Sequence, residues 1–143
     1  MKDIVLFESN NPNLFNYTSI LGNKVVEIKN NEDILKNKRK KILFYNPSYK
    51  WNNKIIKNIK SGAILINLGH LIYSTSFKRA SYISQIQNVI NMCLKQSIDF
   101  TFASFAKEES HIRNTFEKTL IAMLFLNNLD SAKKFVSLLS EFL

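Results

Sequence analysis

The sequence has no aspartate or glutamate between Ile34 and Ile98, although this 65-residue segment contains twelve lysines and arginines. The rest of the chain holds 8 of the 20 basic residues and all 11 acidic residues, so the segment accounts for the whole net charge of +9. Charges of one sign repel one another and contribute nothing to folding. We therefore expect a continuous cationic surface completed by an anionic macromolecule, and nucleic acid is the leading partner. The twelve basic residues are Lys36, Lys38, Arg39, Lys40, Lys41, Lys50, Lys54, Lys57, Lys60, Lys78, Arg79 and Lys95.

Cysteine, glycine and proline are also scarce, at 1, 3 and 2 residues. A single Cys93 excludes an intramolecular disulfide and is typical of a reducing compartment. The scattered glycines exclude a glycine-rich phosphate loop. No apolar run reaches membrane-spanning length, and Ile4–Phe7 is too short for a secretory signal. We expect one domain over residues 1–143 that is cytoplasmic, or nuclear in a eukaryote, and does not bind membranes.

Five short apolar runs rich in β-branched or aromatic residues predict buried strands. Strands that alternate with helices favour a parallel sheet in an α/β fold. Parallel strands that are buried on both faces have sequences that are continuous apolar runs. Five strands are too few for a closed eight-stranded barrel, so an open doubly wound sheet and a curtailed barrel both remain possible. The predicted strands are Ile4–Phe7, Val25–Ile28, Ile42–Tyr45, Ala63–Leu68 and Phe100–Phe105.

Helical spacing of apolar residues occurs between and after these strands. We expect a helix over Leu14–Leu21 that ends at Gly22, and a long helix around Ala80–Cys93. Two more helices are predicted at Asn114–Leu126 and at Asp130–Phe142, the second capped by Asp130.

A further helix is predicted to open near Tyr49, and it would place Lys50, Lys54 and Lys57 on one face at positions i, i+4 and i+7. A row of lysines with no carboxylate among them can follow a phosphate backbone. The densest basic cluster directly precedes the third strand, and we expect it to contact phosphates as well. This cluster is Lys38, Arg39, Lys40 and Lys41.

Signals for catalysis are weak. His70 and His111 do not lie in a metal-binding spacing, and no nucleophile-elbow motif surrounds Ser74 or Ser104. His70 follows a strand, where a lone histidine usually serves packing. We therefore expect no catalytic residue and no metal site. Tyr73 and Phe105 could stack on bases, although most of the 11 phenylalanines should form the core.

The stretch from Ile66 to Ser137 resembles the archaeal protein component 3 of ribonuclease P, the relative of the eukaryotic 30-kDa subunit. Matching segments follow one order with preserved spacing over about half of the chain. The chain is shorter than the family, as if early barrel strands were missing, and Gly69-His70 stands where the family has Arg-Pro. The matches are Leu71-Ile72-Tyr73-Ser74, Phe77-Lys78-Arg79-Ala80, Phe102-Ala103-Ser104-Phe105-Ala106, Ile112-Arg113, Glu117 and Ala132-Lys133.

The resemblance implies a reduced or incomplete TIM-type barrel with parallel strands and extra C-terminal helices. It implies a non-catalytic subunit of an endoribonuclease that supports a catalytic RNA in removing the 5′ leader of precursor tRNA. Its partners would be the ribonuclease P RNA and a small α/β protein subunit, with precursor tRNA contacted indirectly. The chain would bind no cofactor, because Mg²⁺ stays with the RNA. Lys78, Arg79, Lys107 and Arg113, near the ends of strands, would join the other RNA-binding residues.

Two alternatives stay open. A degenerate barrel-type metal-dependent phosphoesterase would have to use His70, His111 and Asp99. A general RNA-binding or ribosome-associated α/β protein of unrelated ancestry would carry the same basic segment.

Overall fold

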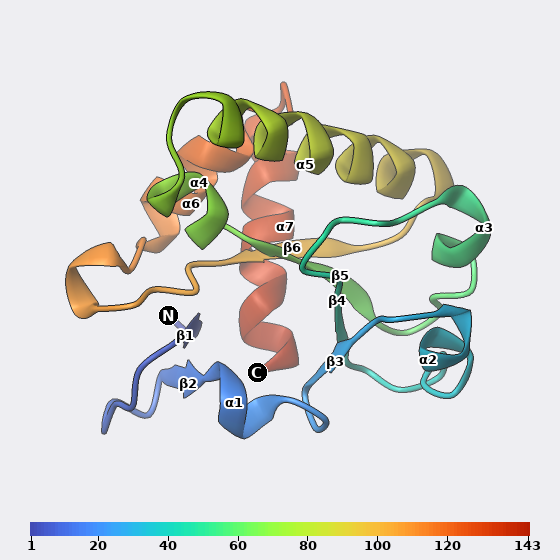
Figure 1. Cartoon of the computed structure of the whole chain (residues 1–143), viewed down its shortest axis with the longest axis horizontal. Coiled ribbons are helices and arrows are strands. Elements are labelled where there is room, and N and C mark those ends of the chain that lie inside the picture. The colour runs from blue at the N-terminus through green and yellow to red at the C-terminus, as the bar shows by residue number, and fades with distance from the viewer.

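The computed structural model describes residues 1–143, which form short parallel strands surrounded by helices (Figure 1). The strands are β1 (Asp3–Val5), β2 (Leu14–Asn16), β3 (Val25–Glu27), β4 (Leu43–Tyr45), β5 (Ala63–Asn67) and β6 (Phe100–Ala103). The helices are α1 (Tyr17–Ile20), α2 (Asn31–Leu35), α3 (Asn53–Ile56), α4 (Gly69–Tyr73), α5 (Ser76–Gln96), the 3₁₀ turn Glu109–His111, α6 (Thr115–Ala122) and α7 (Leu129–Phe142). No helix is both long and apolar enough to cross a membrane.

All strand pairs are parallel, and they form two sheets. The larger sheet has the order β3-β4-β5-β6, and the smaller one pairs β1 with β2. The two sheets meet where β1 runs beside the end of β6. There the Phe105 amide donates to the Ile4 carbonyl and the Leu6 amide donates to the Ala106 carbonyl, both at 2.8 Å. The structure thus confirms a parallel α/β fold, and its sheets do not close into a barrel.

The N-terminal region differs from the sequence prediction. All five predicted strands are present, but the helix predicted over Leu14–Leu21 is wrong, because Leu14–Asn16 instead forms β2 beside β1. The Asn16 side chain then accepts the Thr18 amide and starts α1, which is only four residues long. Gly22 adopts φ +84°, a left-handed conformation that suits a turn.

The start predicted for the helix near Tyr49 is also wrong. Tyr49 has φ +54°, which interrupts a right-handed helix, and its hydroxyl donates to the Asn67 carbonyl at 3.2 Å. Helix α3 begins only after Asn52, whose side chain accepts the Ile55 amide. Lys50 therefore lies outside the helix.

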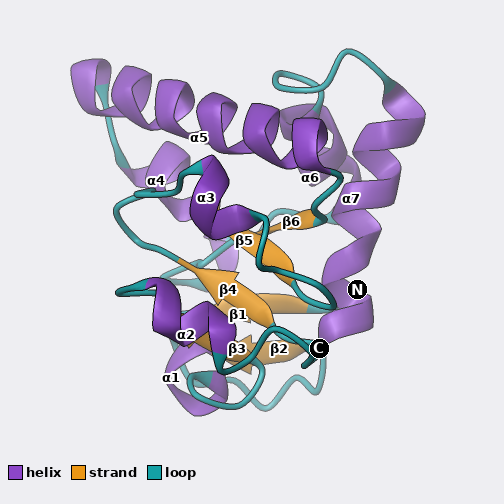
Figure 2. Cartoon of the chain, turned by 90° about the vertical axis from the view of Figure 1, so that its right-hand side faces the viewer, coloured by secondary structure: helices purple, strands orange, loops and turns teal.

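The larger sheet is covered on one face by α5 (Figure 2). Alternate residues of the strands, including Phe44, Ile66 and Phe102, join Ile90 and Cys93 of α5 in one apolar core. Burial raises the pKa of the Cys93 thiol to about 12, in keeping with a packing role. The C-terminal helices are confirmed as α6 and α7, although α7 is capped by Asn128 and not by Asp130.

The other face of the sheet forms a second core. The intervening strand residues, such as Leu43 and Leu65, pack with Ile4 of β1 and with Leu139 and Phe142 of α7. The Thr101 hydroxyl of β6 donates to the Phe135 carbonyl of α7 at 2.7 Å. Helix α7 therefore lies along β6 and contributes side chains to both cores.

A buried ion pair fastens the N-terminal strand to this framework. Lys118 of α6 lies 3.0 Å from Oδ1 of Asp3, and the two residues are 1% and 0% exposed. The same carboxylate accepts the Ile4 amide, the Ser104 amide and the Ser104 hydroxyl. Burial lowers the pKa of Lys118, and the Asp3 carboxylate opposes this shift. One carboxylate thus joins β1, the end of β6 and α6.

We expect Lys118→Met to destabilise the fold by about 3–5 kcal/mol, because it leaves the Asp3 carboxylate buried without its counter-charge. The double variant Asp3→Asn/Lys118→Met should recover most of this stability, since an amide carries no charge. Urea unfolding measures both variants. A single variant within about 1 kcal/mol of the wild type would contradict the ion pair's role.

Candidate nucleic-acid interface

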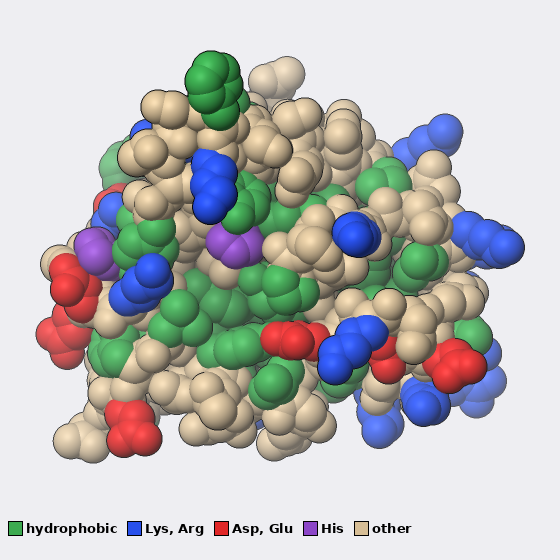
Figure 3. All heavy atoms as spheres, viewed as in Figure 1, with side chains coloured by type: hydrophobic (Ala, Val, Ile, Leu, Met, Phe, Trp, Pro, Cys, Tyr) green, Lys and Arg blue, Asp and Glu red, His purple; other side chains and the backbone are tan.

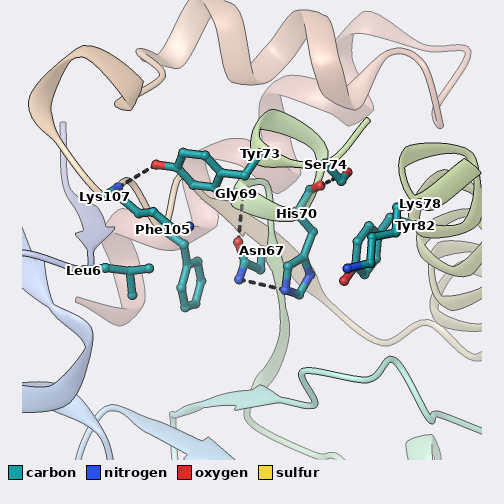
Figure 4. Close-up of a pocket in the computed structure, with 10 residues that line it drawn as sticks. All are labelled: Leu6, Asn67, Gly69, His70, Tyr73, Ser74, Lys78, Tyr82, Phe105 and Lys107. Atoms are coloured by element: carbon teal, nitrogen blue, oxygen red, sulfur yellow. Dashed lines mark hydrogen bonds between the residues drawn. The ribbon is translucent and has the colours of Figure 1, made fainter. Parts of the chain in front are cut away.

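A hollow of about 350 Å³ opens at the carboxyl ends of β5 and β6. Figure 3 shows an apolar depression in this face, with a histidine within it and basic side chains around it. The residues that line the hollow include two lysines and no carboxylate. Functional groups of open parallel sheets collect at this edge. The lining residues are Leu6, Asn67, Gly69, His70, Tyr73, Ser74, Lys78, Tyr82, Phe105 and Lys107, drawn in Figure 4.

Asn67 and Gly69 form the floor of the hollow. Oδ1 of Asn67 accepts the Gly69 amide at 2.7 Å, and its Nδ2 donates to the Tyr45 hydroxyl at 2.9 Å. A β-carbon at position 69 would lie 2.8 Å from Oδ1 of Asn67 and 3.2 Å from the Phe105 carbonyl oxygen. A side chain here would displace the Asn67 amide and crowd the carbonyl oxygens of Ser104 and Phe105, so the position favours glycine.

His70 forms one wall of the hollow. Its ring stacks on Tyr82 with centroids 4.5 Å apart and planes 12° apart, and its Nδ1 lies 2.9 Å from the Tyr49 hydroxyl. Partial burial lowers the pKa of His70, and no carboxylate lines the hollow to counter this. His70 is thus held by hydrogen bonding and stacking, as a packing histidine is, but it also faces a cavity.

Tyr73 connects the two sides of the mouth. Its hydroxyl accepts the Lys107 amide at 2.6 Å and lies 2.9 Å from Nδ1 of His111. Nζ of Lys107 lies 4.4 Å from the Tyr73 ring centroid, within cation–π range. These contacts fix the loop after β6 against α4.

The end of β6 brings the resemblance segments together. Phe105 is 2% exposed and has φ +48°, an uncommon conformation for a non-glycine residue that often marks functional sites. The Ser104 hydroxyl accepts the Arg113 amide at 2.9 Å, so the segment before α6 is tied to this strand. Tyr73, Lys78 and Lys107 line the hollow beside them. Segments 71–74, 77–80, 102–106 and 112–113 therefore converge on one end of the sheet.

The basic residues do not form one continuous surface, so that expectation is wrong. Lys78 and Lys95 lie at opposite ends of α5, roughly 25 Å apart at 1.5 Å per residue. Lys54 and Lys57 share a shallow hollow with Lys95, whereas Lys50 lines a different one beside Glu27. Lys38, Arg39, Lys40 and Lys41 form a third group, in the loop that leads to the amino end of β4.

These cations are nevertheless free of acidic partners. All twelve basic residues of the acid-free segment are exposed, and none forms an ion pair within 4.0 Å. Lys107 is exposed and unpaired as well, while Arg113 lies 3.9 Å from Glu117. Each group thus presents positive charge that nothing in the fold neutralises.

The residues required by the phosphoesterase alternative are not brought together. Asp99 precedes β6 and lies at its amino end, whereas His70 and His111 follow strands at the carboxyl end. His111 pairs with Glu108 at 3.4 Å, and His70 contacts Tyr49 and Tyr82. No group of three His, Cys, Asp or Glu side chains gathers as a metal site.

The fold is similar to that of a chain in the cryo-EM structure of archaeal ribonuclease P with mature tRNA. The TM-score is 0.68 at 14% sequence identity, and the likeness covers 82% of this chain. It covers 55% of that chain, so this protein spans about half of its length. No protein-family profile and no curated protein sequence matches the chain.

We expect the stability of the protein to fall as the pH drops below about 6.5, the ordinary pKa of histidine, because the folded pKa of His70 is lower. The unfolded chain then takes up the proton first, so the contribution of neutral His70 is full above that pH and is lost below it. His70→Asn should remove this component. Urea unfolding of both proteins from neutral pH to about pH 5 measures the difference. Equal decreases in the two proteins would contradict the assignment.

Proposed function

We propose that the protein is a subunit of ribonuclease P, related to protein component 3 and the 30-kDa subunit, that supports removal of the 5′ leader from precursor tRNA. The fold likeness to a chain of archaeal ribonuclease P, over 82% of this protein, carries the proposal. Independent support comes from the sequence, whose resemblance segments converge at one end of the sheet.

In this proposal the fold is a reduced barrel. Two observations support it: every strand pair is parallel, and α7 contributes Leu139 and Phe142 to the second core beside the sheet, where a closed barrel would have further strands. The fold likeness covers 55% of the archaeal chain, so part of that chain has no counterpart in this match.

The protein acts through its charge and shape in this proposal, and catalysis belongs to the RNA and its Mg²⁺ ions. Its unpaired cations neutralise RNA phosphates, and a small α/β protein is its partner in the complex. The separation of the basic groups supports contact with an extended, folded RNA at several places, since one short phosphate segment could not reach all of them.

Reconstitution tests the function. With the cognate ribonuclease P RNA and the partner subunit, the chain should increase cleavage of precursor tRNA at low Mg²⁺, because added cations replace part of the metal's charge screening. Cleavage rates are measured with and without the chain. Equal rates would reject the proposal. Binding that is no tighter to ribonuclease P RNA than to ribosomal RNA at physiological salt would favour the general RNA-binding alternative.

The salt dependence of RNA binding tests one basic group. Replacing Lys54 and Lys57 with glutamine should weaken binding and flatten the plot of log affinity against log salt, by roughly 0.7–0.9 for each phosphate that the variant no longer neutralises. Lys133→Gln/Lys134→Gln is the matched control, because it removes two exposed charges from α7, outside the acid-free segment. If both variants change the slope equally, only net charge matters and the group does not bind phosphate specifically.

A further inference from the structure

The hollow at the carboxyl ends of β5 and β6 has two facing walls, which are formed by different segments of the chain. In Figure 4, Leu6 and Phe105 stand on one side and His70 and Tyr82 on the other, with Asn67 between them. Three of the four wall residues are aromatic, and the His70 and Tyr82 rings are nearly parallel. Phe105 is 2% exposed and packs against Tyr45, so the flat surface offered to a ligand is that of the stacked His70 and Tyr82 rings, facing Leu6. Bases stack on such a surface whatever their sequence.

Most polar groups inside the hollow already have partners, and the Tyr82 hydroxyl is the exception. Both polar atoms of the Asn67 side chain are hydrogen-bonded, to the Gly69 amide and the Tyr45 hydroxyl. The Tyr73 hydroxyl accepts the Lys107 amide, and the Ser74 hydroxyl donates to the His70 carbonyl. A small ligand that depends on many hydrogen bonds would find few here, so the interior favours a ligand held by stacking.

The rim supplies the charge that the interior lacks. Lys78 comes from the first turn of α5 and Lys107 from the loop after β6, and neither forms an ion pair. No carboxylate lines this hollow, although Glu8, Glu108 and Glu109 line a neighbouring one that shares Lys107. The attraction for anions is therefore strongest on the Lys78 side of the mouth. An aromatic interior below two lysines matches a nucleotide, which has a flat base attached to a phosphate.

We propose that this hollow binds one unpaired nucleotide of RNA, with its base between the His70 ring and Leu6 and its phosphate between Lys78 and Lys107. The inference rests on the proposed function, and it names the RNA element that the protein recognises there. A paired base is already stacked and hydrogen-bonded within its helix, so only an unpaired one can enter. Gly69 in the floor and His70 in the wall stand where the family has Arg-Pro, one of the places at which this chain departs from the family sequence.

Binding of a single-stranded RNA pentanucleotide to the full chain tests the pocket. Tyr82→Leu should weaken binding about tenfold, because it removes an aromatic stacking surface that supports the base. Tyr82→Phe should leave it unchanged, since the Tyr82 hydroxyl has no hydrogen-bond partner within the protein and the ring is kept. Lys78→Gln should weaken binding, whereas Lys134→Gln, on α7 and outside the acid-free segment, should not.

NMR locates the ligand in the wild-type protein. The pentanucleotide should shift the ring signals of His70 and Tyr82, and its fully paired duplex should not. Inorganic phosphate is the control for simple anion binding, and it should leave the Tyr82 ring unaffected. Identical shifts with phosphate and the pentanucleotide would overturn the base-binding pocket, as would equal binding by the Leu and Phe variants.

Cross-linking keeps the inference testable if Tyr82→Leu does not fold. RNA containing 4-thiouridine should cross-link to peptides within His70–Tyr82 or Phe105–Lys107, and cross-links found only elsewhere would reject the pocket. Failure of the pocket is distinct from failure of the function. A chain that stimulates cleavage but shows no ligand at His70 keeps the function and loses the pocket. A chain that binds the pentanucleotide there without stimulating cleavage loses the function and keeps the pocket.

Discussion

The fold depends on one buried carboxylate, Asp3. It pairs with Lys118 at 3.0 Å and accepts the Ser104 amide and hydroxyl, so a single side chain connects the first strand, the end of β6 and α6. A buried ion pair is costly unless its other hydrogen-bonding positions are filled, and here the remaining positions of Asp3 are filled by β1 and β6. Ser104 in turn accepts the Arg113 amide, which fixes the path of the chain into α6. The mouth of the hollow is thus shaped by a contact that lies wholly beneath it.

The sequence predicted the parts of the fold whose signal is local. Parallel strands buried on both faces read as apolar runs, and all five predicted strands are present. It did not predict β2, because Leu14–Asn16 is short and only partly buried, so pairing with β1 decides its conformation. The predicted start of the helix near Tyr49 was wrong for a similar reason. Tyr49 takes a left-handed conformation while its hydroxyl contacts Asn67, a residue 18 positions away.

The candidate site was predicted only in part. The resemblance segments contained Tyr73 and Lys78, and Lys107 was expected to bind RNA because it follows a strand. Asn67 and Tyr82 were missed, although each carries a usable signal. Asn67 is the polar residue that ends a buried strand, where α/β proteins place functional groups, and Tyr82 lies one helical turn after Lys78 on the same face.

The prediction of a continuous cationic surface was wrong because charge counted along a sequence carries no information on which side of a fold each residue faces. None of the twelve basic residues of the acid-free segment forms an ion pair with a glutamate or aspartate in the structure.

The hollow is built from a small part of the chain. Its lining comes from β5, β6 and the segments that directly follow them, with Leu6 contributed by the chain after β1. Phe105 belongs both to this lining and to the second core, where Leu139 and Phe142 of α7 pack with Leu43 and Leu65. The reduced fold we propose therefore needs two features together: a helix that fills the second core beside the sheet, and a first strand held in place by Asp3. Both features act on β6, because α7 accepts a hydrogen bond from Thr101 and Asp3 accepts the amide and hydroxyl of Ser104. The end of the sheet that carries the hollow is thus held from two sides.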